Sequence, residues 1–354
     1  MAVDKIKPYN DPRVSLRSAN LNGHNYGYLY SPASTEVPHR GTVVLIHGFP
    51  DISFGWRYQF PFLTSLGLDV IAPDCMGYGR TDSPLFTLKD YTYKRVSDDI
   101  AELCRQLGLK HIILGGHDWG GAIVYRVAHY YPDLISSVFS ICTPYAPPIP
   151  KYEPLVQLVK TKLPNFAYQI HFASGELEQE IRSKDEIRQF LNNMYGARTP
   201  EGEAAFDAEG RVDFERQRRV GRNKLLDDDE LKYYVDEYAR HGLNGPLNWY
   251  RTREDNFIDE WTHFFDEGRK SNKDAVRDLT IKQELLFVLA TKDQALKPFM
   301  AAKMGDRIPN LTRREVVAGH WALWQKPEEC NKIIGEWLHE KVFNKAGGSG
   351  KSKL

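Results

Sequence analysis

The chain has 354 residues, of which 47 are Lys or Arg and 47 are Asp or Glu, so its formal net charge is zero. A hydrophobic share of 42% and a charged share of 27% are typical of a globular protein and exclude a disordered or collagen-like chain. Nucleic-acid binding normally needs a basic excess, which this composition lacks. We therefore expect a small-molecule or protein partner and no nucleic acid.

The four cysteines form no Cys-x-x-Cys pair and no zinc-like spacing, which predicts buried thiols and no metal site. The first residues have neither the apolar stretch of a secretory signal nor the composition of a transit peptide. No apolar run reaches the roughly 18 to 20 residues that span a bilayer, so we expect no membrane insertion. The oligomeric state is left open between a monomer and a homodimer.

Taken in chain order, an Asn22-Gly23 turn before the alternating stretch 26–30 predicts a β-hairpin. Apolar, β-branched runs then recur between segments with helical spacing, as in parallel strands buried on both faces. These runs predict strands at 42–46, 70–72, 112–114, 138–141, 285–289 and 315–317, and the spacing predicts helices at 93–107, 122–130 and 327–339. The pattern indicates an α/β protein with a mostly parallel sheet.

The alternation stops between about Pro144 and Phe265, where a proline-rich stretch opens a helical, charge-rich segment without a convincing strand. We interpret this segment as a helical cap inserted into an α/β core. The predicted boundaries are 1–144 and 266–343 for the core, 145–265 for the cap and 344–354 for a flexible tail.

The final tripeptide, Ser352, Lys353 and Leu354, is an address that a peroxisomal import receptor reads at a free carboxyl end. The Gly/Ser-rich stretch 346–351 before it would hold the tripeptide away from the body of the protein. We therefore expect the import receptor as a partner and the peroxisome as the location, with the cytoplasm as the alternative.

The stretch after the run at 112–114 reads Gly-Gly-His-Asp-Trp-Gly-Gly and leads into a helical segment. This strand, turn and helix form the pattern of a nucleophile elbow, with Asp118 in the place of the usual serine. Small residues flank the nucleophile because larger side chains would collide with the strand and the helix. We therefore predict Asp118 as a nucleophile at the carboxyl edge of the sheet, above a helix N-terminus that stabilises its charge.

Two further residues follow predicted strand ends, Asp293 after 285–289 and His320 after 315–317. The order nucleophile, acid, histidine is that of the α/β-hydrolases, so Asp293 is predicted to orient His320, the general base. Upstream, His-Gly-Phe-Pro at 47–50 ends another strand. The backbone N–H groups of Phe49 and Trp119 are predicted to form an oxyanion hole.

These motifs resemble the soluble epoxide hydrolases of the α/β-hydrolase superfamily over roughly residues 32–339. The resemblance implies an α/β-hydrolase core, a mostly parallel eight-stranded sheet flanked by helices, with the inserted helical cap. It also implies that two cap tyrosines hold the epoxide oxygen and donate a proton. The segments 166–172 and 247–251 match the two tyrosine motifs, so these roles pass to Tyr168 and Tyr250. The expected substrate contacts, around an apolar epoxide, are Gln169, Phe172, Trp249 and Trp321.

The chemistry of a carboxylate nucleophile also limits the class of substrate. Attack on a carboxylic ester would give an anhydride, whereas attack on an alkyl carbon gives a plain ester. Suitable substrates are therefore strained epoxides or alkyl halides, and no metal or organic cofactor is needed. A haloalkane or haloacetate dehalogenase shares the aspartate, the tryptophan and the histidine, but the tyrosine motifs favour an epoxide. A pathway-specific hydrolase of secondary metabolism stays open, and an intact triad opposes a non-catalytic scaffold.

Overall fold

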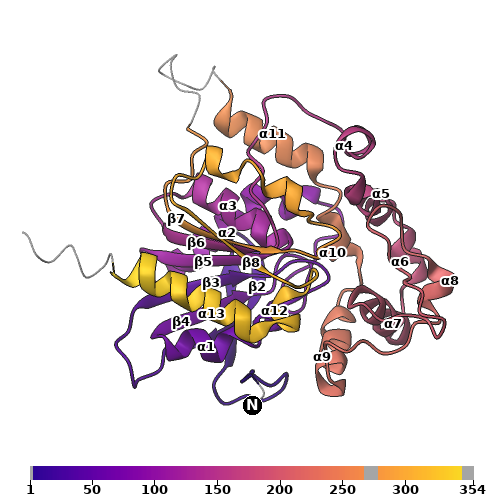
Figure 1. The fold of residues 1–354 in the computed structure, drawn as a ribbon, viewed down its shortest axis with the longest axis horizontal. Coiled ribbons are helices and arrows are strands. Elements are labelled where there is room, and N and C mark those ends of the chain that lie inside the picture. Colours follow the sequence, from indigo (N-terminus) through magenta and orange to yellow (C-terminus); the bar gives the residue numbers. More distant parts are fainter. Residues whose placement is uncertain (1–2, 267–277, 345–354) are drawn as a thin grey trace, which may run out of the picture.

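A computed structural model describes residues 3–266 and 278–344 of the chain (Figure 1). Its strands are β1 (Ser15–Leu21), β2 (His24–Ser31), β3 (Gly41–Ile46), β4 (Leu68–Pro73), β5 (Ile112–His117), β6 (Ile135–Ile141), β7 (Glu284–Ala290) and β8 (Leu311–Val316). They form an eight-stranded sheet in the order β1-β2-β4-β3-β5-β6-β7-β8. The two ladders of β2 are antiparallel and the others are parallel, which confirms the mostly parallel sheet.

The burial of each strand follows its place in the sheet. The central strands β3, β5 and β7 are aliphatic and buried nearly throughout, because helices cover both of their faces. The edge strands β1 and β8 are largely exposed and polar. For this reason the apolar pattern located only the end of β8: the strand begins at Leu311, four residues before the predicted start at Glu315, and Val317 lies outside it, exposed.

Helices lie on both faces of the sheet, with α1 and α13 on one face and α2 and α3 on the other (Figure 1). Their bounds are α1 (Gln59–Ser65), α2 (Tyr93–Gln106), α3 (Trp119–Tyr130), α12 (Ala322–Gln325) and α13 (Pro327–Trp337). The three helices predicted from spacing are all present. Helix α3 begins three residues earlier than predicted, directly after Asp118.

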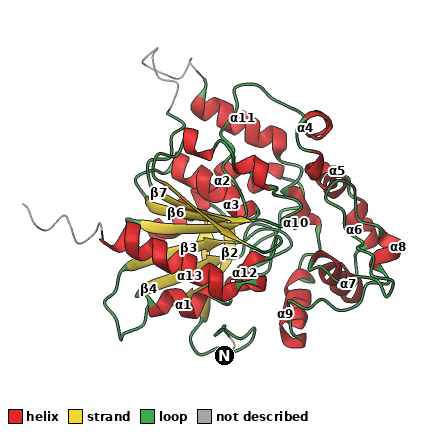
Figure 2. Cartoon of the chain, viewed as in Figure 1, coloured by secondary structure: helices red, strands yellow, loops and turns green. Residues whose placement is uncertain are grey.

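Between β6 and β7, the regular structure of the described residues is helical apart from an isolated bridge between Phe206 and Val212, and loops join the helices (Figure 2). Its helices are α4 (Leu155–Thr161), α5 (Ala167–Ala173), α6 (Glu176–Glu180), α7 (Lys184–Met194), α8 (Phe214–Gln217), α9 (Asp228–Tyr238), α10 (Asn244–Asn248) and α11 (Arg253–Phe264). The inserted helical cap is confirmed, and its predicted limits at 145 and 265 stay a prediction. The tail beyond Asn344, with its terminal tripeptide, lies outside the described residues.

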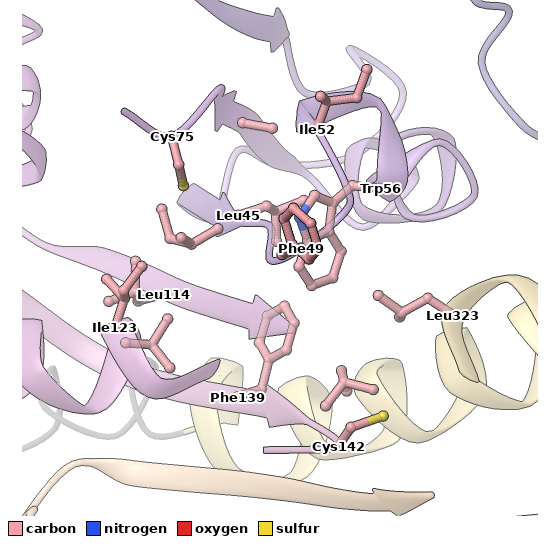
Figure 3. Packing of buried hydrophobic residues seen from close by; sticks show 14 of the residues in the cluster. Leu45, Phe49, Ile52, Trp56, Cys75, Leu114, Ile123, Phe139, Cys142 and Leu323 are labelled. Atoms are coloured by element: carbon pink, nitrogen blue, oxygen red, sulfur yellow. The ribbon is translucent and has the colours of Figure 1, made fainter. Parts of the chain in front are cut away.

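The core is packed closely under the nucleophile strand. Phe139 of β6 lies against the β5 backbone, and a Cβ atom at Gly115 would be 2.1 Å from its ring. The same ring meets Trp56 edge to face, and Leu323 of α12 points toward these rings (Figure 3). Such packing leaves β5 little freedom to shift, so the turn that follows it is held in place.

All four cysteines are buried and none forms a disulfide, as their spacing predicted. Among the residues that the structure describes, no group of His, Cys, Asp and Glu side chains has an arrangement able to hold a metal ion. No helix in the same residues combines the length and apolar character needed to cross a membrane.

Candidate active site

Strand register brings the predicted site residues to one edge of the sheet. Ile46 at the end of β3 pairs with Gly116 near the end of β5, so the loops that follow these strands leave the sheet side by side. On the next strands, Ala290 of β7 pairs with Val316 of β8. Because the strands are parallel, their carboxyl ends meet here, and residues far apart in the sequence become neighbours.

The elbow holds Asp118 in a strained conformation, with φ +54° and ψ −121°. This region of backbone space is unfavourable for a residue with a side chain, and it persists because the surrounding packing imposes it. A Cβ atom at Gly120 would lie 2.0 Å from the Ile46 carbonyl oxygen, and one at Gly116 would lie 2.3 Å from the Gly120 oxygen. The tight turn therefore requires both glycines, as the sequence pattern indicated.

The loop after β3 approaches the same carboxylate. A Cβ atom at Gly48 would be 2.2 Å from Asp118 Oδ1, so only glycine permits this approach. The Phe49 backbone N–H donates to Asp118 Oδ1 at 2.7 Å, and the Trp119 backbone N–H also donates to this carboxylate. The structure thus brings together both N–H groups of the predicted oxyanion hole.

The imidazole of His320 lies between the carboxyl groups of Asp293 and Asp118. His320 Nδ1 lies 2.9 Å from Asp293 Oδ2, and His320 Nε2 lies 3.5 Å from Asp118 Oδ2. Asp293 is buried, and its Oδ1 accepts hydrogen bonds from the Ala295 and Leu296 N–H groups at 2.9 and 3.0 Å. This anchoring fixes the carboxylate and, through it, the orientation of the imidazole.

The ionisable groups of Asp118, Asp293 and His320 shift one another's pKa values. Burial disfavours the charged imidazole of His320, but the carboxylates of Asp293 and Asp118 outweigh burial and raise its pKa to about 9. Burial raises the pKa of Asp118, an effect that His320 and the two backbone donors oppose. For Asp293, burial is outweighed by His320 and the backbone donors, and the pKa is lowered. Because its pKa lies above 7, His320 is a cation in the free enzyme at neutral pH.

His117, the residue before the nucleophile, was not among the predicted site residues. Its imidazole is buried, and Nε2 lies 2.8 Å from the backbone oxygen of His320. Burial and the charge of His320 lower the pKa of His117 to about 3, so it is neutral and can donate to that oxygen. The contact stabilises the loop that carries His320. Sequence spacing could not predict this contact, because His117 and His320 are 203 positions apart.

The two predicted cap tyrosines come together over the elbow. Tyr168 lies on α5 and Tyr250 lies just after α10, and their ring centroids are 6.1 Å apart. The Tyr250 ring also packs edge to face on Trp119 at 5.1 Å. Burial is the largest cause of a raised pKa in both phenols, and the negative charge of Asp118 raises each further. Both hydroxyl groups therefore keep their protons.

A cavity of about 440 Å³ lies between cap and core and is lined by Asp118, Tyr168 and Tyr250. Of the predicted substrate contacts, Gln169 and Trp249 also line it, and Trp249 Nε1 donates to the Met76 oxygen at 3.0 Å. The other two, Phe172 and Trp321, do not line this cavity. Phe172 packs against Tyr168 and Tyr250, and Trp321 stacks on Trp324 and donates to the Met194 oxygen at 2.9 Å.

Asp51, directly after the His-Gly-Phe-Pro loop, is a second residue that sequence reasoning missed. It is buried, and cap tyrosines contact this loop: Tyr234 donates to Asp51 Oδ1 at 2.6 Å, Tyr238 to Asp51 O at 3.2 Å and Tyr195 to Pro50 O at 2.6 Å. Burial raises the pKa of Asp51 to about 7. These hydrogen bonds tie the cap to the loop that carries the Phe49 N–H group.

The sheet order, the elbow and the row of Asp, His and Asp define an α/β-hydrolase, and residues 41–327 match the family described as alpha/beta hydrolase fold. The chain is 37% identical to epoxide hydrolase srdG of Neurospora crassa over 96% of its length and 99% of that protein. It is 33% identical to bifunctional epoxide hydrolase 2 of Sus scrofa, over 97% of this chain and 60% of that protein. Within the α/β-hydrolases, the chain therefore belongs to the epoxide hydrolases.

The similarity extends to a solved structure. The fold superposes on the crystal structure of epoxide hydrolase A from Mycobacterium thermoresistibile with a TM-score of 0.74 and 26% sequence identity. The match covers 93% of this chain and 99% of the other. The neighbour is therefore similar in core and cap alike.

Proposed function

We propose that this protein hydrolyses an epoxide to a vicinal diol through a covalent ester on Asp118. The observation that carries the proposal is the shared cavity, in which a carboxylate nucleophile meets two phenols that keep their protons. A carboxylate forms a stable ester only at an alkyl carbon, and a phenol supplies the proton that an opening epoxide needs.

In the first step, Asp118 Oδ2 attacks one ring carbon, because Oδ1 is held by the Phe49 N–H group. The bond between that carbon and the epoxide oxygen breaks. Tyr168 and Tyr250 donate hydrogen bonds to the developing alkoxide, and one of them transfers its proton. The products are an ester of Asp118 and a tyrosinate, which recovers a proton from solvent before the next turnover.

Once the ester has formed, His320 releases its proton to solvent; in the second step the neutral imidazole takes a proton from water, and the hydroxide attacks the ester carbonyl. The oxyanion accepts hydrogen bonds from the Phe49 and Trp119 N–H groups. Its collapse expels the diol oxygen, which takes the proton from His320. The hydroxyl that was added leaves Asp118 as a carboxylic acid, and loss of its proton to solvent restores the nucleophile. Esterification removes the charge of Asp118, one cause of the raised His320 pKa, so forming the ester itself favours the neutral base.

The competing function is dehalogenation, which uses the same three residues. It predicts halide release and needs no proton donor. Incubation with styrene oxide and, separately, with a haloalkane, with diol and halide measured by chromatography, separates the two functions. We expect diol from the epoxide and no halide; halide release without diol formation would contradict the proposal.

We also propose that the terminal tripeptide, Ser352 to Leu354, directs the protein to peroxisomes, where lipid-derived or secondary-metabolite epoxides would be its substrates. The support is the sequence alone, since these residues lie outside the described part of the chain. The test is the distribution of an N-terminally tagged protein with and without the tripeptide. Punctate signal that becomes diffuse on deletion is expected, and diffuse signal with the tripeptide intact contradicts the assignment.

A further inference from the structure

A second cavity, of about 730 Å³, lies apart from the active site, and no residue of the described chain lines both cavities. It is bounded by strands β1 and β2, by the loop after β4 and by the segment that follows α9. The chemistry of epoxide opening makes no use of it. Polar and charged side chains prevail in its lining: Arg17, Ser18, Asn25, Arg80, Asp82 and Arg240.

Two glycines allow the loop after β4 to lie close against the sheet. A Cβ atom at Gly27 of β2 would be 2.6 Å from the Arg80 Cβ atom. Gly79 has φ +50°, and a Cβ atom there would be 2.3 Å from Asp74 Oδ2. The Arg80 backbone N–H donates to the same oxygen at 3.1 Å. The loop is therefore fixed, and with it the backbone of Arg80 beside the cavity.

Arg80 and Arg240 share one carboxylate. Arg80 Nη2 lies 3.2 Å from Glu237 Oε1, and Arg240 Nη2 lies 3.3 Å from the same oxygen. Arg240 Nε also donates to Glu237 Oε2 at 2.7 Å. Glu237 is buried, so it holds the two guanidinium groups next to each other. One carboxylate balances only one of the two positive charges.

The other charges around the cavity leave this excess in place. Arg17 adds a third guanidinium group, which lies over the Tyr30 ring at 3.7 Å. Among the described residues that line the cavity, Asp82 is the only carboxylate. In residues 3–266 and 278–344, Glu237 is the only carboxylate that forms an ion pair with the other two arginines, and none pairs with Arg17. Three guanidinium groups therefore face two carboxylates.

The lining also supplies hydrogen-bond donors that have no partner in the part of the chain that the structure describes. They are Nε and Nη1 of Arg80, Nη1 of Arg240, the Ser18 hydroxyl group and the Asn25 side-chain amide. Guanidinium, hydroxyl and amide donors around an excess positive charge match the several oxygens of a phosphate group. A carboxylate, with two oxygens, would use fewer of these donors.

We propose that this cavity binds the phosphate ester or diphosphate group of a small molecule, held by Arg80 and Arg240. The inference goes beyond epoxide hydrolysis and does not depend on it. Arg240 follows the cap helix α9, whereas Arg80 belongs to a loop of the core. A bound anion therefore links cap and core, and it should raise the Tm of the protein.

Titration calorimetry of the full chain with pyrophosphate and with ADP tests the site. We expect saturable binding of pyrophosphate with a Kd below about 1 mM. Arg80→Met and Arg240→Met should each raise this Kd by about tenfold or more, because each removes a charged donor. Asp82→Asn should lower it by about threefold or more, because a repelling carboxylate is lost. The amide oxygen of this variant can still accept from the Asn25 N–H group.

Arg105→Met and Glu102→Gln are the matched controls. The two residues form an ion pair on α2, with Nε 2.7 Å from Oε2, and neither lines the cavity. These variants change the net charge by the same amounts and should leave the Kd within about twofold of the wild type.

Three results would overturn the inference: no saturable binding of either anion, equal losses in Arg105→Met and the two cavity variants, or weaker binding in Asp82→Asn. Vesicles of phosphatidylcholine and phosphatidic acid form a further arm of the test. Binding to these vesicles without binding of either free anion would assign the phosphate to a lipid surface and would also contradict a small-molecule site.

Discussion

Asp118 has two oxygens in different surroundings. Oδ1 accepts a hydrogen bond from the Phe49 N–H group, and Oδ2 lies 3.5 Å from His320 Nε2. One oxygen is thus placed to become the ester carbonyl, and the other to bond to substrate. The same two backbone donors that oppose the rise in the Asp118 pKa would serve the oxyanion in the second step. The arrangement prepares both half-reactions before substrate binds.

The paired phenols give a prediction at this scale. Tyr168→Phe and Tyr250→Phe should each slow ester formation by about 10- to 100-fold, and the double variant should nearly abolish it, because no proton donor remains. The measurement is the rate at which the mass of the Asp118 peptide increases after mixing with epoxide. Tyr152→Phe is the control, since this phenol lines the same cavity and the Asp118 charge is not among the causes of its raised pKa. An equal loss in the control would contradict the assignment.

At the scale of elements, the elbow depends on backbone approaches that leave no room for side chains. Strand β3, strand β5 and the start of α3 converge within contact distance at Gly116 and Gly120. The cap contributes through a different element, since tyrosines of α9 and the Tyr195 hydroxyl hold the loop after β3. The oxyanion loop is therefore fixed from the sheet on one side and from the cap on the other.

Gly120→Ala tests this convergence. Its Cβ atom would lie 2.0 Å from the Ile46 oxygen, so β3 and α3 must separate. We expect a loss of stability of about 1–3 kcal/mol, a fall in Tm of at least about 3 °C and a kcat reduced by at least about tenfold. Gly305→Ala is the control, since a Cβ atom at this exposed position meets nothing within 4 Å. Near-wild-type Tm and kcat in Gly120→Ala would show that the turn tolerates a side chain.

At the scale of the whole molecule, buried ionisable groups make stability depend on pH. Burial raises the pKa of Asp51 from 3.8 to about 7, so between these values the folded state binds a proton that the unfolded state has lost. Stability from this group therefore falls as pH rises from about 4 to 7. His320, with a pKa raised from 6.5 to about 9, adds stability that is complete below pH 6.5 and is lost as pH rises through 9.

Asp51→Asn should remove the first of these two slopes. The amide oxygen can still accept from the Tyr234 hydroxyl, so the contact with the cap remains. The free energy of unfolding of the variant relative to the wild type should rise between about pH 4 and 7, by at most about 1.4 kcal/mol per pH unit. Urea unfolding across this range measures it. Parallel curves for the two proteins would show that Asp51 does not titrate there.

The sequence predicted what depends on local pattern. Buried strands, the elbow glycines and the order of Asp118, Asp293 and His320 all leave such patterns, and the structure brings these three residues together. The edge strand β8 has almost no apolar pattern in its sequence, because Thr312, Arg313 and Arg314 are polar and are not buried. The partners of His117 and Asp51 come from distant segments of the chain, and no spacing in one sequence predicts such contacts.

Covalent catalysis by Asp118 is the central claim, and a single turnover in water labelled with ¹⁸O tests it most directly. Enzyme in excess over epoxide should place the label in the Asp118 carboxylate and leave the first diol unlabelled, because the oxygen added to the diol comes from the aspartate. Mass spectrometry of the Asp118 peptide and of the diol measures both. Label in the diol from that first turnover, with an unlabelled Asp118 peptide, would show that water attacks the epoxide directly and would contradict the account.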